Sequence, residues 1–284
     1  MINLKKINNE TVKPMIIRGK GDDKPDTRPI KGANLFSELY ANIFLCAKKK
    51  SGKTVVATKI IKECTNKHTT VVVFCSTLDK DKNHIIIKRY CKIQGIPYIG
   101  YTSMVEDGVN VLSELLSKLE EDARNEDESD DDEQERLDRA DKKLMTLFNE
   151  ENDSEVKSRK PKFQTPEYLL FFDDLSNELK SPVLTSFLKK NRHYKAKVII
   201  SSQYVHDLPP AGLKQMDYCC VFKGMPEDKL KKIYGDFDLT IPLSKLLKLY
   251  THATIDKYSF LFIDIREESY RRRFDCKYIL KDQN

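Results

Sequence analysis

Short apolar runs alternate with longer amphipathic stretches from Tyr40 onward in this chain of 284 residues. This alternation is typical of β-α units arranged around a mostly parallel sheet. Strands are predicted at Asn42–Cys46, Thr70–Ser76, Pro97–Tyr101, Tyr168–Asp173, Lys197–Ser202, Tyr218–Lys223 and Tyr258–Ile265. Helices are predicted at Thr54–Cys64, Asp81–Gln94, Val109–Glu121, Pro182–Arg192, Pro226–Tyr234 and Leu243–Tyr250.

Two regions fall outside this alternation. Residues 1–38 are polar and rich in turn formers, so we expect an N-terminal arm, with Met15–Ile17 as a candidate edge strand, followed by one domain over residues 39–284. The second region is an acidic insertion at about residues 120–165. Because its like charges repel and it holds few apolar residues, we expect a mobile insertion or a solvated helical hairpin rather than a domain; "RLDRADKKLMTLF" is the candidate returning helix.

The charge of the chain is unevenly distributed. Residues 120–136 hold eleven acids and two bases, so against a total of +6 the rest of the chain carries +15. A basic surface suits a polyanionic partner. Solvated lysine faces with no partner are the alternative.

The seven cysteines form no C-x-x-C pair and have no histidine at metal-ligand spacing. We therefore expect a reducing compartment, with neither disulfides nor zinc. The N-terminal residues lack the apolar region of a secretion signal, and no run reaches the roughly 18 apolar residues of a membrane span. The expectation is a soluble protein.

One segment carries a candidate nucleotide-binding motif. "AKKKSGKT" matches the phosphate-binding loop G-x-x-x-x-G-K-[ST] except at its first position, and it lies between a predicted strand and a predicted helix. Gly52 would let the backbone approach phosphate, Lys53 would reach the β- and γ-phosphates, and Thr54 would hold Mg²⁺. Alanine can replace the first glycine if its φ is negative. The candidate ATP-binding residues are Ala47, Lys48, Lys49, Lys50, Ser51, Gly52, Lys53 and Thr54, and a plain basic turn is the alternative.

Two later strands end in polar residues that complete such a site. "YLLFFDDLS" ends in Asp173, a candidate Mg²⁺ ligand, and Asp174, a candidate catalytic base. "KVIISSQYVHD" places Gln203 where a polar sensor would reach the γ-phosphate or the attacking water, if this strand lies between the other two. Taken singly, each has an ordinary explanation, a capped turn or a loop glutamine. Their order along the chain favours a nucleotide-hydrolysing site.

These segments, with "NRHYKAKVIISSQY", "MDYCCVFKG" and "YSFLFIDI", resemble the genome-packaging ATPases of large DNA viruses and virophages, a group within the FtsK/HerA branch of P-loop NTPases. The resemblance covers roughly residues 40–265 and implies a RecA-like ASCE fold. Ala47 departs from the usual glycine, and Asp174 stands where many relatives carry glutamate.

The resemblance implies an ATP- and Mg²⁺-dependent motor that moves double-stranded DNA into a preformed capsid. It further implies a homo-oligomeric ring, contacts with capsid or membrane-associated virion proteins, and a location in the host cytoplasm or the virion. In such rings a neighbouring subunit commonly supplies an arginine to the transferred phosphoryl group. Arg192 is the candidate, and a helix C-terminal cation is the equal alternative.

A packaging motor grips DNA of any sequence by its phosphates, so contacts should come from basic loops. The candidates are Lys48 to Lys50, Lys229 with Lys231 and Lys232, and Arg271 to Arg273, each of which also fits a solvated basic face. Three other functions stay open: a DNA translocase or helicase with another role, a P-loop kinase, and a scaffold that binds without hydrolysis. The acidic insertion disfavours the kinase, because it would repel a phosphorylated substrate.

Overall fold

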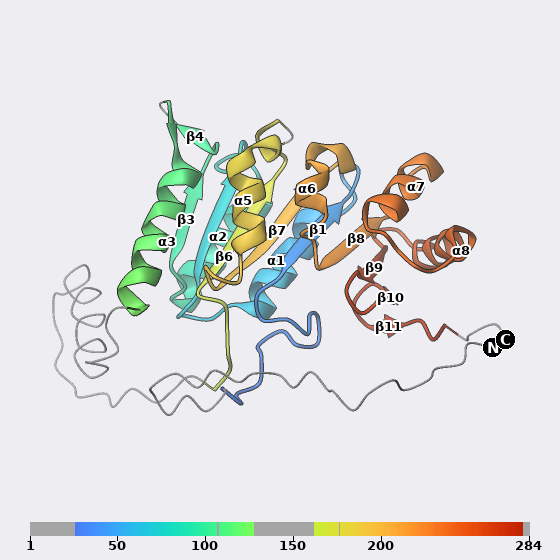
Figure 1. The fold of residues 1–284 in the computed structure, drawn as a ribbon, viewed down its shortest axis with the longest axis horizontal. Coiled ribbons are helices and arrows are strands. Elements are labelled where there is room, and N and C mark those ends of the chain that lie inside the picture. The colour runs from blue at the N-terminus through green and yellow to red at the C-terminus, as the bar shows by residue number, and fades with distance from the viewer. Residues whose placement is uncertain (1–25, 107, 128–161, 176, 281–284) are drawn as a thin grey trace, which may run out of the picture.

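A central sheet of nine strands organises the molecule, and the computed structural model describes residues 26–106, 108–127, 162–175 and 177–280 (Figure 1). Its order is β11-β10-β9-β8-β1-β7-β6-β2-β3, and β4 and β5 form a separate pair. The strands are β1 Asn42–Cys46, β2 Thr70–Cys75, β3 Tyr98–Tyr101, β4 Val105–Glu106, β5 Val109–Asn110, β6 Tyr168–Asp173, β7 Ala196–Ser202, β8 Tyr218–Phe222, β9 Phe260–Asp264, β10 Ser269–Arg272 and β11 Cys276–Lys277.

The strands from β8 to β3 in this order run parallel, whereas β9, β10 and β11 continue the sheet antiparallel at one side. Strand β7 lies between β1 and β6. The predicted α/β fold of the P-loop NTPase type is therefore confirmed, including the extra strand that separates the phosphate-loop strand from the acidic strand. β4, β5, β10 and β11 were not predicted, because each has two to four residues and no continuous apolar run.

Helices cover both faces of this sheet. The α-helices are α1 Lys53–Cys64, α2 Lys82–Gln94, α3 Val111–Asp127, α5 Pro182–Lys190, α6 Pro210–Leu213, α7 Glu227–Asp236 and α8 Leu243–Ala253, with short 3₁₀ turns η1 Glu178–Lys180 and η2 Val205–Asp207. One apolar cluster joins the sheet to α1 and α2, and another joins its other face to α3, α5, α6, α7 and α8. All five residues of β1 are buried because both faces are covered.

Local sequence signals set the ends of several helices. The carboxylate of Asp81 accepts a hydrogen bond from the backbone N–H of Asn83 and so caps the start of α2. Gly95, with φ 64°, caps its other end directly after Gln94. Ser181 caps the start of α5 in the same way as Asp81, and Pro182 occupies its first turn. These capping residues determine where α2 begins and ends and where α5 begins.

The segment before β1 belongs to the folded domain. Leu35 and Phe36 are buried, and the ring of Phe36 lies 4.9 Å from that of Tyr218. The ammonium of Lys197, buried within β7, donates to the backbone oxygen of Glu38 at 2.8 Å. The expected N-terminal arm therefore ends before residue 38, because its last residues pack against the sheet.

The remaining sequence expectations have mixed outcomes. Met15–Ile17 and the candidate helix at residues 136–148 lie outside the described residues, as does most of the acidic insertion. Within the described part, every helix is too short or too polar to span a lipid bilayer. All seven cysteines are free thiols; six are buried, and Cys276 on β11 is exposed.

Candidate functional site

The candidate site lies where the parallel strands reach their carboxyl ends. Strand register places Cys46 beside Ser202, and Asp173 beside both Ser201 and Cys75. Four strands far apart in sequence, β1, β2, β6 and β7, therefore end at one edge of the sheet. In doubly wound sheets this edge is where ligands bind.

The loop after β1 turns through two left-handed residues before α1 begins. Ala47 is buried, its backbone N–H donates to the oxygen of Ser202 at 3.0 Å, and it is not among the described residues with positive φ. Lys50 and Gly52 have φ values of 62° and 93°, and α1 begins directly after Gly52. Because the first position needs no left-handed backbone, alanine fits where the motif usually has glycine.

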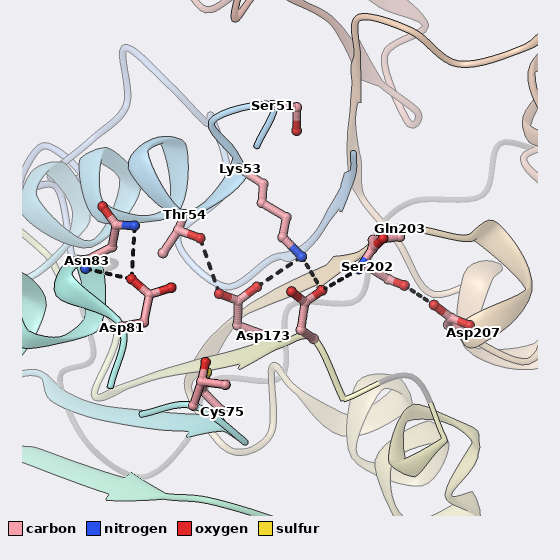
Figure 2. Close-up of polar contacts among 12 residues, drawn as sticks. Ser51, Lys53, Thr54, Cys75, Asp81, Asn83, Asp173, Ser202, Gln203 and Asp207 are labelled. Atoms are coloured by element: carbon pink, nitrogen blue, oxygen red, sulfur yellow. Dashed lines mark hydrogen bonds and ion pairs between the residues drawn. The ribbon is translucent and has the colours of Figure 1, made fainter. Parts of the chain in front are cut away.

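Lys53 and Thr54 point from the start of α1 toward the acidic end of β6 (Figure 2). The ammonium of Lys53 forms an ion pair with Asp174 and lies 3.5 Å from Oδ1 of Asp173. The hydroxyl of Thr54 donates to Oδ2 of Asp173 at 3.3 Å. Lys53, Thr54 and Asp173 are all buried, so the contacts among these three residues form with little competition from water.

His84 is a site residue that the sequence analysis missed. Its Nε2 lies 3.0 Å from Oδ2 of Asp173, and its ring stacks on Phe171. Burial lowers the pKa of His84, but hydrogen bonds to Asp173 and Cys75 outweigh it and raise the pKa to about 9. Burial likewise works against the charged form of Asp173, yet His84 and Lys53 hold the pKa of Asp173 below its usual value. The result is a charged carboxylate held in one orientation.

His84 also belongs to a group of residues that could hold a metal ion, although no zinc site was expected from the sequence. Ligand atoms of Cys75, His84 and Asp173 all lie within 4.8 Å of one another. No local sequence pattern indicates this group, because Cys75 ends β2 and His84 lies in the first turn of α2, which is not the spacing of a known zinc motif.

Asp174 and Gln203 form the outer part of the site. Asp174 adopts φ 53°, and its side chain is 40% exposed. The side-chain amide of Gln203 donates to Oδ1 of Asp174 at 3.5 Å. Next to Gln203, the hydroxyl of Ser202 donates to Asp207, which fixes the loop after β7. Asp174 is thus the carboxylate that water can reach, whereas Asp173 is buried.

The residues present fit a magnesium ion and a nucleotide. Mg²⁺ prefers oxygen ligands, and the Thr54 hydroxyl and the Asp173 carboxylate provide two of them side by side. Oδ1 of Asp173 is buried without a hydrogen-bond partner among the described residues. A cleft of about 640 Å³ opens beside these groups, lined by the phosphate loop, both aspartates and Tyr258. This volume is in the range of small-molecule sites.

Arg192 does not join these residues within the chain. It follows α5 and lies 3.7 Å from Asp217 and 3.9 Å from Glu38. Asp217 accepts the backbone N–H of Asn42, at the start of β1. Arg192 is therefore at the amino edge of the sheet, opposite the edge that carries Lys53 and Asp173.

The three basic groups that were expected to contact DNA differ in the contacts that they make within the chain. Lys231 and Lys232 form ion pairs with Glu227 and Asp236, and Arg272 and Arg273 pair with Asp256. Arg271 reaches the backbone oxygens of Asn34 and Leu35, and Lys229 lies 4.0 Å over the ring of Tyr204. Lys48, Lys49 and Lys50 are exposed on the loop after β1.

Comparison with known proteins gives a limited set of similarities. No protein-family model matches the chain. It is 32% identical over 104 residues to "Uncharacterized protein 075L" of Invertebrate iridescent virus 6, a match that covers 36% of this chain and 40% of that protein.

The chain is also similar to two solved structures. The DNA-packaging ATPase B204 from Sulfolobus Turreted Icosahedral Virus is 18% identical with a TM-score of 0.49, over 81% of this chain and 95% of that one. EssC (ATPases 2 and 3) from Geobacillus thermodenitrificans is 10% identical with a TM-score of 0.48, over 84% of this chain and 38% of that one.

Proposed function

We propose that this protein is a Mg²⁺-dependent ATPase that moves double-stranded DNA into a preformed viral capsid. One observation supports ATP hydrolysis: five side chains lie together at one edge of the sheet, those of Lys53, Thr54, Asp173, Asp174 and Gln203. Binding alone would not need a second, water-accessible carboxylate beside a glutamine.

The phosphate loop and Lys53 would bind the triphosphate. Backbone N–H groups at the start of α1 would stabilise a bound anion, and the Lys53 ammonium would contact the β- and γ-phosphates. Thr54 and Asp173 would hold Mg²⁺, which when bound neutralises charge on the phosphates. The hydrogen bond from His84 keeps the Asp173 carboxylate facing Thr54.

Asp174 would then act as the general base. Its carboxylate is exposed enough to meet a water molecule, and it accepts hydrogen bonds from both Lys53 and Gln203. A phosphate anion that binds Lys53 would compete with Asp174 for the ammonium and free the carboxylate to accept a proton. Gln203 would orient the water, since its amide can donate to one oxygen and accept from another.

An arginine from a second subunit would complete the site. Arg192 is the candidate, and its position at the amino edge means that it could reach only the nucleotide of a neighbour. Such a contact would join one surface of a subunit to a different surface of its neighbour, and contacts of this kind close into a ring when the rotation between neighbours closes. A homo-oligomeric ring is the closed assembly that the proposed role of Arg192 supports.

The DNA substrate and the packaging role rest on the resemblance of the motif-bearing segments and on charge. Outside residues 120–136 the chain carries +15, which suits a phosphate backbone of any sequence. Because Lys48 to Lys50 are exposed while the other two basic groups have partners within the chain, these loop lysines are the strongest candidates for transient phosphate contacts. The relative in an iridescent virus supports a viral setting.

The test is the steady-state ATPase rate of the full-length protein with and without double-stranded DNA of unrelated sequences. We expect Mg²⁺-dependent hydrolysis that DNA accelerates regardless of sequence and that weakens as salt rises. Hydrolysis without DNA stimulation would refute translocation but keep the ATPase. No hydrolysis at high protein concentration, with ATP still bound, would favour the scaffold.

A further inference from the structure

Tyr258 occupies an unusual position at the edge of the candidate nucleotide site. Strand β9 runs antiparallel to β8, so it begins at the edge where the parallel strands end. Tyr258 comes two residues before β9 and therefore meets the phosphate loop: a Cβ atom placed on Gly52 would lie 3.5 Å from the Tyr258 ring. Both residues line the 640 Å³ cleft.

The backbone of Tyr258 is strained. Its φ is 60°, a left-handed conformation that bulky residues rarely adopt. Its neighbours hold it there: Ser259 is buried, its hydroxyl donates to the oxygen of Asp256 at 2.6 Å, and its backbone oxygen accepts from Lys223 at 3.1 Å. Asp256 is in turn paired with Arg272 and Arg273.

Packing does not account for this strain, because the ring stays in contact with solvent. Tyr258 is 54% exposed, and the Lys257 ammonium lies 4.9 Å from the centre of its ring. An exposed aromatic ring held in a strained conformation beside a cleft is typical of a residue that contacts a ligand.

The order of the strands indicates which part of a nucleotide would reach Tyr258. Asp173 and Asp174 end β6, on one side of β1, and mark the place of the γ-phosphate and metal. Tyr258 lies before β9, on the other side of β1, with Gly52 between them. A triphosphate with its terminal phosphate at the aspartates would thus extend its nucleoside toward Tyr258 and the exposed Val55.

We propose that the ring of Tyr258 stacks against the purine base of the bound nucleoside triphosphate. This inference rests on the proposed nucleotide site and adds the part that binds the base. Stacking on an aromatic face uses the π-system that every base has, and purines offer the larger area. Affinity should therefore depend on the base being present and on the ring of Tyr258, but not on its hydroxyl.

The experiment compares two ligands and two variants by isothermal titration calorimetry in Mg²⁺. The ligands are a non-hydrolysable ATP analogue and inorganic tripolyphosphate, which has no base. The variants are Tyr258→Phe, which keeps the ring, and Tyr258→Asn, which removes it with a residue that tolerates positive φ. Thermal denaturation confirms that both fold.

We expect Tyr258→Asn to weaken binding of the ATP analogue about tenfold, as is usual for loss of one base stack, while tripolyphosphate binding stays unchanged and Tyr258→Phe matches the wild type. Equal affinity of Tyr258→Asn and wild type for the analogue would overturn the inference, as would an equal loss for both ligands, which would mean that the ring only supports the loop. Failure of the wild type to bind either ligand would instead refute the proposed function.

Discussion

The ammonium of Lys53 forms an ion pair with Asp174 and lies 3.5 Å from the carboxylate of Asp173. One cation at the start of α1 is thus shared between the two acids that follow each other at the end of β6. Their exposures differ, with Asp173 buried and Asp174 at 40%. Adjacent residues of the same type therefore have different environments, and the two roles proposed for them follow from that difference.

Lys53→Ala should reduce ATP hydrolysis by about a hundredfold or more, because it removes the cation that stabilises the phosphates. It should also weaken nucleotide binding. The measurement is the steady-state ATPase rate together with titration of an ATP analogue. Lys59→Ala, an exposed lysine on the same helix, is the matched control and should behave as wild type. Equal activity of the two variants would refute the phosphate-loop assignment.

Asp174→Asn should lower the maximal rate by about 10²- to 10⁴-fold while ATP still binds, since asparagine cannot accept the proton. Asparagine also tolerates the φ of 53° at this position, so the fold should be kept. Single-turnover hydrolysis separates the chemical step from binding. A variant that hydrolyses ATP normally would exclude Asp174 as the base and leave Asp173 as the main acidic residue of the site.

His84→Ala should raise the Mg²⁺ concentration needed for half-maximal activity by about tenfold, because partners of metal ligands fix their orientation. Direct binding of Mn²⁺, followed by electron paramagnetic resonance, gives a second readout that does not depend on turnover. His68→Ala changes an exposed histidine and serves as control. If the Mn²⁺ affinity of His84→Ala matched that of this control, the hydrogen bond to Asp173 would have no role in positioning the metal ligand.

Ala47→Gly should not increase activity, although it restores the usual residue of the motif. Ala47 is buried and needs no positive φ, so glycine would only add freedom to the unfolded chain and cost about 1 kcal/mol of stability. Chemical denaturation and the ATPase rate measure the two effects. A large gain in activity would show that the loop of the wild-type protein is distorted by the alanine.

The sequence was sufficient to predict the features that depend on one strand and the residues next to it. Gly52, Lys53 and Thr54 come directly between a buried strand and a helix, and Asp173 ends another buried strand, so their meeting follows from the parallel sheet alone. The place of β7 between β1 and β6 also agrees with the expectation from Gln203.

The residues that sequence reasoning missed depend on contacts that no local pattern carries. His84 contacts Asp173 although the two residues are 89 positions apart in the sequence. From the sequence alone, His84 is only a polar residue near the start of an amphipathic helix. Tyr258 was predicted to begin a strand, but the strand starts at Phe260, and the left-handed turn before it is set by Asp256 and its arginine partners. Arg192 was predicted at the end of a helix that stops at Lys190, and only the sheet shows which edge it occupies.

The exposure of Cys276 makes this protein suitable for site-specific labelling. A maleimide dye added to the native chain should attach at that thiol on β11, because the other six cysteines are buried. The wild-type sequence thus offers one fluorophore position without any cysteine substitution. In a labelled mixture of subunits, energy transfer between such dyes would report whether subunits associate, as the proposed ring requires.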